Sequence, residues 1–240
     1  MNYENLKNSL NDFLGRYAGA ERRPVFHDID QTLPELRSLE LAFPRIRTEA
    51  DNLLQWRIAM PRYHEVHPPA WRISNSTRGS WSVFLLDLLG YHSKRNQGLC
   101  PQTSTALQRI PGRLQSFFSI LDPGKSVPIH GSPYLGYLRY HLGVNIPKDD
   151  PPLLRVRGRE YVWKEGEGMI FDGTWPHEVV NRSRSPQVML IVDILRPLPL
   201  IPDLINRALL WGLAAPFYAY KVMERVERYS RDLIERELFP

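Results

Sequence analysis

The spacing of apolar and polar positions changes several times along the chain. Residues 1–60 place apolar side chains every three to four positions, as in LPELRSLELAFPRIRTEADNLLQW, which predicts helices. Residues 61–115 are rich in Pro, Ser and Gly apart from the apolar segment WSVFLLDLLGY, which favours a loop-rich connector. Residues 200–240 return to a helical pattern, with opposite charges four positions apart in VMERVERYSRDLIEREL.

The stretch 116–199 has a different pattern, with short β-type segments separated by strong turn signals. The segments are SFFSIL, YLRYHLGVNI, LLRVRG, EYVWKEGEGMIFD, HEVVNRS and QVMLIVDIL. DPGKS, PKDDPP, EGEG and RSRSP provide turns between them. We therefore expect one domain over 1–240, with a mainly β core of sandwich or jelly-roll type and helices before and after it. The mouth of such a barrel is the natural place for a ligand.

Composition and charge narrow the classes of function. The 240 residues carry a net charge of +5, but acidic and basic residues alternate along the chain, so we expect no nucleic-acid partner. The single cysteine, Cys100, excludes a disulfide within the chain and fits a reducing compartment. The N-terminal MNYENLKNSLNDFLGRY reads as an amphipathic helix and not as a signal peptide, which predicts a cytoplasmic protein.

The longest apolar run is ALLWGLAAPFYAY at 208–220, which is too short to span a bilayer and is interrupted by Pro216. Arg207 and Lys221 flank it. Two interpretations remain open from the residues alone: a helix that covers the domain, or a segment that lies on a membrane surface. In the second case residues 203–223 form a membrane contact, and the protein is peripheral at the inner membrane.

Two histidines in the β region occupy similar bends next to proline. His130 lies in KSVPIHGSPY and His177 in TWPHEVV, and such bends can bring two imidazoles to a barrel mouth, where they can chelate one divalent metal. Ferrous oxygenases usually add a carboxylate two residues after the first histidine, but Ser132 stands there. On the residues alone, polar histidines in turns and a two-histidine metal site both remain open.

A longer set of motifs resembles the aspartyl/asparaginyl β-hydroxylases, which are Fe(II)- and 2-oxoglutarate-dependent dioxygenases. The matching stretches, between about 115 and 199, are FFSILDPGKSVPIH, GSPYLGYLRYHLGVNIP, YVWKEGEGMIFDGTWPHEVVNRS and VMLIVDILRPLP. The resemblance, to the short bacterial type, implies a double-stranded β-helix. It also implies a metal held by His130 and His177 alone, with a small residue in the place of the carboxylate.

The resemblance also implies a set of co-substrate contacts. Ser119, Arg139 and His141 match residues that contact 2-oxoglutarate in the family. The family has an arginine where Gln187 stands, and an uncharged amide binds a carboxylate less strongly. Arg184, in the preceding turn, is the substitute cation that we expect.

The implied reaction uses Fe(II), 2-oxoglutarate and O2 to hydroxylate an unactivated C–H bond. The expected substrate is an Asp/Asn-type amino acid, peptide or carrier-bound residue. Two alternatives stay open: hydroxylation of a lipid acyl chain of the lipid A type, and a non-catalytic cupin-like module that binds a small acid. Gln187 favours the last of these.

Overall fold

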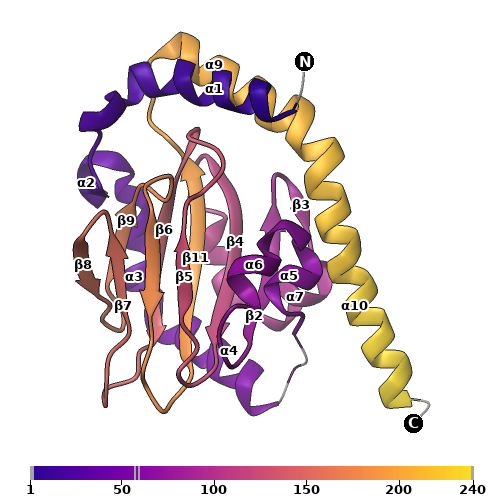
Figure 1. Cartoon of the computed structure of the whole chain (residues 1–240). Helices are drawn as coiled ribbons and strands as arrows, with labels where there is room; N and C mark the ends of the chain where they lie inside the picture. The colour runs from indigo at the N-terminus through magenta and orange to yellow at the C-terminus, as the bar shows by residue number, and fades with distance from the viewer. Residues whose placement is uncertain (1–2, 57, 59, 239–240) are drawn as a thin grey trace.

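The computed structural model describes residues 3–56, 58 and 60–238, and its centre is a pair of antiparallel β-sheets (Figure 1). The larger sheet has the strand order β1-β9-β6-β11-β4-β2-β3, and the smaller sheet the order β5-β10-β7-β8. The strands are β1 (Phe26–His27), β2 (Trp81–Leu88), β3 (Tyr91–His92), β4 (Arg113–Leu121), β5 (Val127–His130), β6 (Tyr137–Asn145), β7 (Leu153–Val156), β8 (Arg159–Val162), β9 (Gly168–Phe171), β10 (His177–Val180) and β11 (Gln187–Leu195).

Helices precede and follow this core, as the sequence pattern predicts, and further helices lie between β1 and β2 and between β3 and β4. They are α1 (Tyr3–Ala18), η1 (Ala20–Arg22), α2 (Ile29–Thr32), η2 (Pro34–Leu36), α3 (Arg37–Leu41), α4 (Phe43–Gln55), α5 (Tyr63–Val66), η3 (Pro68–Ala70), α6 (Trp71–Ser74), α7 (Lys94–Leu99), α8 (Pro101–Leu107), α9 (Leu200–Leu209), η4 (Leu210–Ala219) and α10 (Tyr220–Leu238). Figure 1 shows α1 and α9 across one end of the sheets and α10 along one side.

Both faces of the larger sheet are covered, so its central strands are buried throughout. Successive residues of β4 illustrate this: Phe117 packs into the cluster between the two sheets, and Phe118 packs into the cluster under the helices. The helical cluster includes Leu39 of α3 and Ile46 of α4. A strand buried on both sides reads as a continuous apolar run, which is what QVMLIVDIL of β11 is.

The expected fold, a mainly β double-stranded β-helix between helices, is confirmed by this arrangement. The β core is nevertheless larger than the stretch 116–199. The segment WSVFLLDL, in the predicted connector 61–115, forms β2 and pairs with β4 inside the larger sheet. EYVWKEGEGMIFD forms two strands, β8 in one sheet and β9 in the other, because the chain turns at Gly166 with φ of +77°.

The C-terminal segment is helical without a break from α9 to α10. Pro216 does not end the helix, because residues 210–219 widen into a π-helix that accommodates the missing N–H donor. Among the residues that the structure describes, no helix combines the length and apolar character needed to cross a membrane.

A buried carboxylate joins two helices outside the β core. Glu49 of α4 accepts hydrogen bonds from the backbone N–H groups of Gln102 and Thr103 at 2.7 and 2.8 Å, and from the Thr103 hydroxyl at 2.6 Å. These donors lie in the first turn of α8, which has no partner for its N–H groups within its own helix. The carboxylate therefore fixes α8 against α4.

We predict that Glu49→Ala lowers the free energy of unfolding by about 3 kcal/mol, because it leaves the buried N–H and hydroxyl donors of Thr103 without an acceptor. Asp51→Ala is the control in the same helix: Asp51 is half exposed and pairs with Arg47 on the surface, so its loss should cost less than about 1 kcal/mol. Urea unfolding followed by circular dichroism measures both. Equal losses would contradict the role given to Glu49.

Candidate metal and co-substrate site

His130 and His177 lie directly opposite each other across two paired strands. His130 is the last residue of β5 and His177 the first of β10, and the two are partners in the antiparallel register. Their ring centroids are 4.2 Å apart with an angle of 51° between the planes. Strand pairing thus brings together two imidazoles that are 47 positions apart in the sequence.

Backbone carbonyl groups fix the protonation of both rings. The Nδ1 atom of His130 donates to the Pro128 carbonyl at 2.8 Å, and that of His177 donates to the Trp175 carbonyl at 2.9 Å. A carbonyl oxygen can only accept, so Nδ1 carries the proton and Nε2 keeps its lone pair. This is the arrangement in which histidine binds a metal through Nε2.

The surroundings keep both imidazoles neutral. Burial, with the positive charge of a protonated His130 as the next cause, lowers the pKa of His177 to about 3. Burial also lowers the pKa of His130, against the opposing effect of its Pro128 hydrogen bond. At neutral pH both Nε2 lone pairs are therefore available, and two neutral imidazoles suit a divalent ion such as Fe(II).

No third protein ligand joins the pair among the described residues, where no group of three His, Cys, Asp or Glu side chains lies close enough to hold a metal. Ser132, two residues after His130, lies across from Gly173, and its backbone N–H donates to the Gly173 carbonyl at 2.7 Å. A Cβ atom at Gly173 would come within 2.7 Å of the Ser132 hydroxyl oxygen. This close approach leaves room for only small residues beside the histidines.

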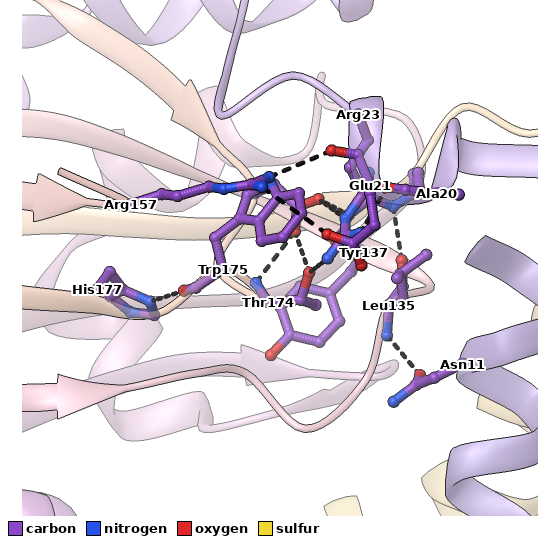
Figure 2. A network of polar contacts seen from close by, with 12 residues as sticks. Asn11, Ala20, Glu21, Arg23, Leu135, Tyr137, Arg157, Thr174, Trp175 and His177 are labelled. Carbon is purple, nitrogen blue, oxygen red and sulfur yellow. Dashed lines mark hydrogen bonds and ion pairs between the residues drawn. The ribbon is translucent and has the colours of Figure 1, made fainter. Parts of the chain in front are cut away.

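The loop before His177 is held by charge and by ring stacking, and Figure 2 shows part of this network. Asp172 forms ion pairs with Arg23 and Arg196, both at 2.9 Å. The guanidinium groups of Arg23 and Arg157 lie over the Trp175 ring, 3.6 and 4.0 Å from its centroid. Since the Trp175 carbonyl orients His177, these contacts position that imidazole.

Asp172 is buried, and its carboxylate is bound by the two arginines, so its role is structural. Burial by itself raises the pKa of Asp172, but the charges of Arg196 and Arg23 and hydrogen bonds from Thr174 outweigh burial and leave the pKa below its usual value. The carboxylate is thus ionised at neutral pH, as its two arginine partners require.

A pocket lies between the two sheets, next to the histidines. Its empty volume is about 450 Å³, part of which is open to solvent. It brings together six residues predicted from the sequence, which are His130, His177, Ser119, Arg139, His141 and Gln187. The remaining lining is mainly apolar or aromatic: Trp81, Leu121, Val127, Leu154, Trp163, Phe171, Val179, Met189 and Ile191. Such a lining excludes water and leaves a few polar groups to orient a ligand.

Several buried polar atoms of this lining have no hydrogen-bond partner. They are both ring nitrogens of His141, both amide atoms of Gln187 and the indole nitrogen of Trp163. An unsatisfied buried polar group costs about 1–3 kcal/mol, and native proteins keep few of them. Their concentration in one pocket indicates that a polar ligand satisfies them.

Arg139 and Ser119 each already form hydrogen bonds with another side chain of the protein. Arg139 forms two hydrogen bonds with Asp193, at 2.7 Å from Nε and 2.9 Å from Nη2, so much of its charge is compensated. The Ser119 hydroxyl accepts a hydrogen bond from the Trp81 indole at 2.9 Å, which leaves its own proton free to donate. Both side chains can still contribute donors to a carboxylate in the pocket.

The structure does not bring Arg184 to this pocket. Its side chain is exposed, and its backbone N–H donates to Asp149 at 3.1 Å in the turn before β11. Sequence reasoning missed Asp193 and the aromatic wall of Trp81 and Trp163. A signal for Asp193 was present, since a lone carboxylate in the apolar run QVMLIVDIL requires a buried cation.

Comparison with known proteins agrees with this site. The family model described as "Aspartyl/Asparaginyl beta-hydroxylase" matches residues 40–197. The ornithine lipid ester-linked acyl 2-hydroxylase of Rhizobium tropici is 35% identical over 226 residues, which cover 93% of this chain and 79% of that protein. The human aspartyl/asparaginyl beta-hydroxylase is 36% identical over 128 residues, which cover 50% of this chain but only 16% of the human protein.

Among solved structures, the Cnp3 cupin domain of Schizosaccharomyces pombe is similar with a TM-score of 0.33 and 8% identity, over 51% of this chain and 66% of that one. The family match over residues 40–197 includes both paired histidines and every residue that lines the pocket beside them. The chain therefore belongs to the aspartyl/asparaginyl β-hydroxylase family.

Proposed function

We propose that this protein is an Fe(II)- and 2-oxoglutarate-dependent hydroxylase. The observation that carries the proposal is the opposition of His130 and His177, each with Nδ1 bound to a carbonyl and Nε2 free. Iron with 2-oxoglutarate and O2 would supply the oxidising power to hydroxylate an unactivated C–H bond. The two Nε2 atoms would hold the metal and leave its other positions to the co-substrate.

The polar groups of the pocket would orient 2-oxoglutarate. Ser119 offers a hydroxyl proton, Gln187 an amide N–H, and Arg139 the part of its guanidinium that Asp193 does not use. His141 would donate from whichever ring nitrogen faces the ligand, and its low pKa, caused first by burial, keeps it neutral. The surrounding aromatic side chains would exclude water from the reaction.

We infer further that the substrate is the acyl chain of a lipid and not an Asp/Asn-type residue. The order of the two hypotheses changes because similarity to the Rhizobium tropici acyl 2-hydroxylase extends over 93% of this chain, whereas similarity to the human enzyme covers half. The first match therefore extends well beyond the β core. A lipid substrate also explains why the helices after the β core expose apolar side chains.

The helical segment α9–η4 exposes an extensive apolar surface. Its exposed large side chains are Leu200, Ile201, Leu204, Ile205, Trp211, Leu213, Phe217 and Tyr218, with Tyr220 at the start of α10. The buried Asn206 of α9 donates to the Gly136 carbonyl at 2.7 Å, so α9 packs on the loop that leads from His130 into β6. We propose that residues 203–223 contact a membrane surface, which supplies the lipid near the site.

A second candidate function is a non-catalytic module that binds a small acid in the same pocket. Two observations favour it: Gln187 replaces a cation, and Asp193 already compensates Arg139. The two functions differ in turnover, because only the hydroxylase should convert 2-oxoglutarate to succinate when Fe(II) and O2 are supplied.

We expect the anaerobic protein with Fe(II) and 2-oxoglutarate to show the weak visible charge-transfer band of the chelate, and to form succinate when O2 is admitted. His177→Ala should lower metal affinity by more than about 100-fold, since even outer hydrogen-bond partners of a ligand contribute 10–100-fold. His92→Ala, at an exposed histidine of β3, is the matched control and should bind iron as the wild type does. A band without succinate would support the binding module, and the absence of both the band and succinate would overturn the hydroxylase.

The Gln187→Arg variant should bind 2-oxoglutarate about tenfold more tightly, because a charge-assisted hydrogen bond to a carboxylate is stronger than a neutral one by about 1–1.5 kcal/mol. Arg184→Ala should leave this affinity unchanged, since Arg184 lies outside the pocket. Titration of the charge-transfer band measures both. A weaker affinity in Arg184→Ala would show that this side chain reaches the co-substrate after all.

Membrane contact is tested by flotation with vesicles of phosphatidylglycerol and phosphatidylethanolamine. We expect the wild type to float with the vesicles and the double variant Leu204→Ser, Phe217→Ser to remain largely unbound, because two exposed apolar side chains of the contact are lost. Leu41→Ser removes an even more exposed leucine outside this segment and should float like the wild type. Equal flotation of all three proteins would contradict the contact.

A further inference from the structure

A second pocket lies on the same inner face of the larger sheet as the site of the paired histidines. It contains about 250 Å³ of non-atom space, part of it open to solvent. Its lining comes from α5, β2, β4, η4 and α10, and the loop residue after α5: Tyr63, Val66, His67, Val83, Leu85, Gln115, Phe117, Tyr218 and Val222. No residue named above as a metal or co-substrate contact belongs to it.

Strand register places this pocket next to the first one. His141 is opposite Ile191, Ile191 is opposite Phe117, and Phe117 is opposite Leu85. His141 and Ile191 line the first pocket, whereas Phe117 and Leu85 line the second. Neighbouring strands are about 4.8 Å apart, so the second pocket begins about 10 Å from His141 along one row of side chains.

One aromatic ring separates the two pockets. The ring centroid of Tyr63 is 4.5 Å from that of Trp81, which lines the first pocket, and 6.4 Å from that of Phe117, which lines the second. Tyr63 is only partly buried and lies in the one-turn helix α5. A chain that occupies both pockets must therefore displace this ring.

The lining of the second pocket suits a hydrocarbon chain. Val66, Val83, Leu85 and Val222 are almost completely buried, and none of the described lining residues is an acid, a lysine or an arginine. Its polar groups lie toward the surface, where the Tyr218 hydroxyl contacts His67 Nδ1 at 3.0 Å. Burial, followed by the charges of Arg225 and Arg139, lowers the pKa of His67 to about 4, so this ring is also neutral.

The pocket opens toward the apolar surface that α9–η4 exposes. Tyr218 lies on the π-helix, and its neighbour Phe217 is 68% exposed. The π-helix is a rare conformation that is frequent at functional sites, and here it places Tyr218 over the pocket. Tyr218 therefore belongs both to the exposed apolar surface and to the second pocket, and the Tyr63 ring lies between that pocket and the first one.

We propose that the second pocket holds the hydrocarbon tail of a fatty acyl substrate, with its carbonyl end in the first pocket. This subsite rests on the lipid acyl substrate proposed above. The distance along the paired side chains from Leu85 through Phe117 to His141 then determines how far the reacting carbon lies from the methyl end of the acyl chain.

The test measures binding of laurate to the full chain under anaerobic conditions without 2-oxoglutarate, so that no turnover occurs. We expect one laurate to bind per protein in isothermal titration calorimetry. Val83→Phe and Val222→Phe, on β2 and α10, fill the pocket and should each weaken binding at least tenfold. Leu200→Phe is the control, because Leu200 is 74% exposed and outside the pocket, and it should bind laurate as the wild type does.

A second measurement needs no variant. Photocrosslinking of the wild type with a fatty acid that carries a terminal diazirine should label peptides from β2, β4 or α10. Labels confined to α9, or wild-type laurate affinity in both folded phenylalanine variants, would overturn the subsite. If laurate binds in the second pocket but no succinate forms, the subsite is supported and the hydroxylase is rejected. If succinate forms but no label appears in the pocket, the hydroxylase is supported and the subsite is rejected.

Discussion

The antiparallel pairing of β5 with β10 is the constraint on which the proposed chemistry depends. It makes the last residue of one strand the partner of the first residue of the other, and both residues are histidines. The local hydrogen bond of each ring to a carbonyl sets only the orientation of that ring. The strand pairing is what brings the two rings together. A slip of the register by one residue would send one ring to the opposite face of the sheet.

The larger network around this pair maintains that register. Asp172 ties the loop before His177 to Arg23, which precedes the core in sequence, and to Arg196, which follows it. A buried carboxylate between two arginines is expensive to leave unpaired, so these segments are held together as one unit. Trp175, whose ring contacts the guanidinium groups of Arg23 and Arg157, completes the loop and supplies the carbonyl that orients His177.

The polar groups around the pocket differ in whether the protein itself satisfies their hydrogen bonds. His141 and Gln187 are buried without partners, which lowers the stability of the protein alone and favours any ligand that can satisfy them. Arg139 is the opposite case, because Asp193 satisfies it in the free protein. A ligand carboxylate must therefore share Arg139 with a competing carboxylate, and specificity in this pocket rests more on neutral donors than on net charge.

The sequence by itself determined the class of the fold and the types of donor. Turn signals and short apolar runs predict most strands, because these features are local in the chain. The residues alone left a two-histidine site open, and it was the family resemblance that implied His130, His177, Ser119, Arg139 and His141 as site residues. The place of WSVFLLDL in the larger sheet could not be read in this way, since an apolar run of that length fits a buried strand or a buried helix equally well.

Only the tertiary structure decided which side chains meet. It placed Arg184 on the surface, paired Arg139 with Asp193 across two strands, and carried the helix through Pro216 by widening it. It also put Tyr63 between two pockets, of which the second alone takes its walls from five separate elements. These results depend on strand register and on packing between segments far apart in sequence, and no pattern within a single segment encodes them.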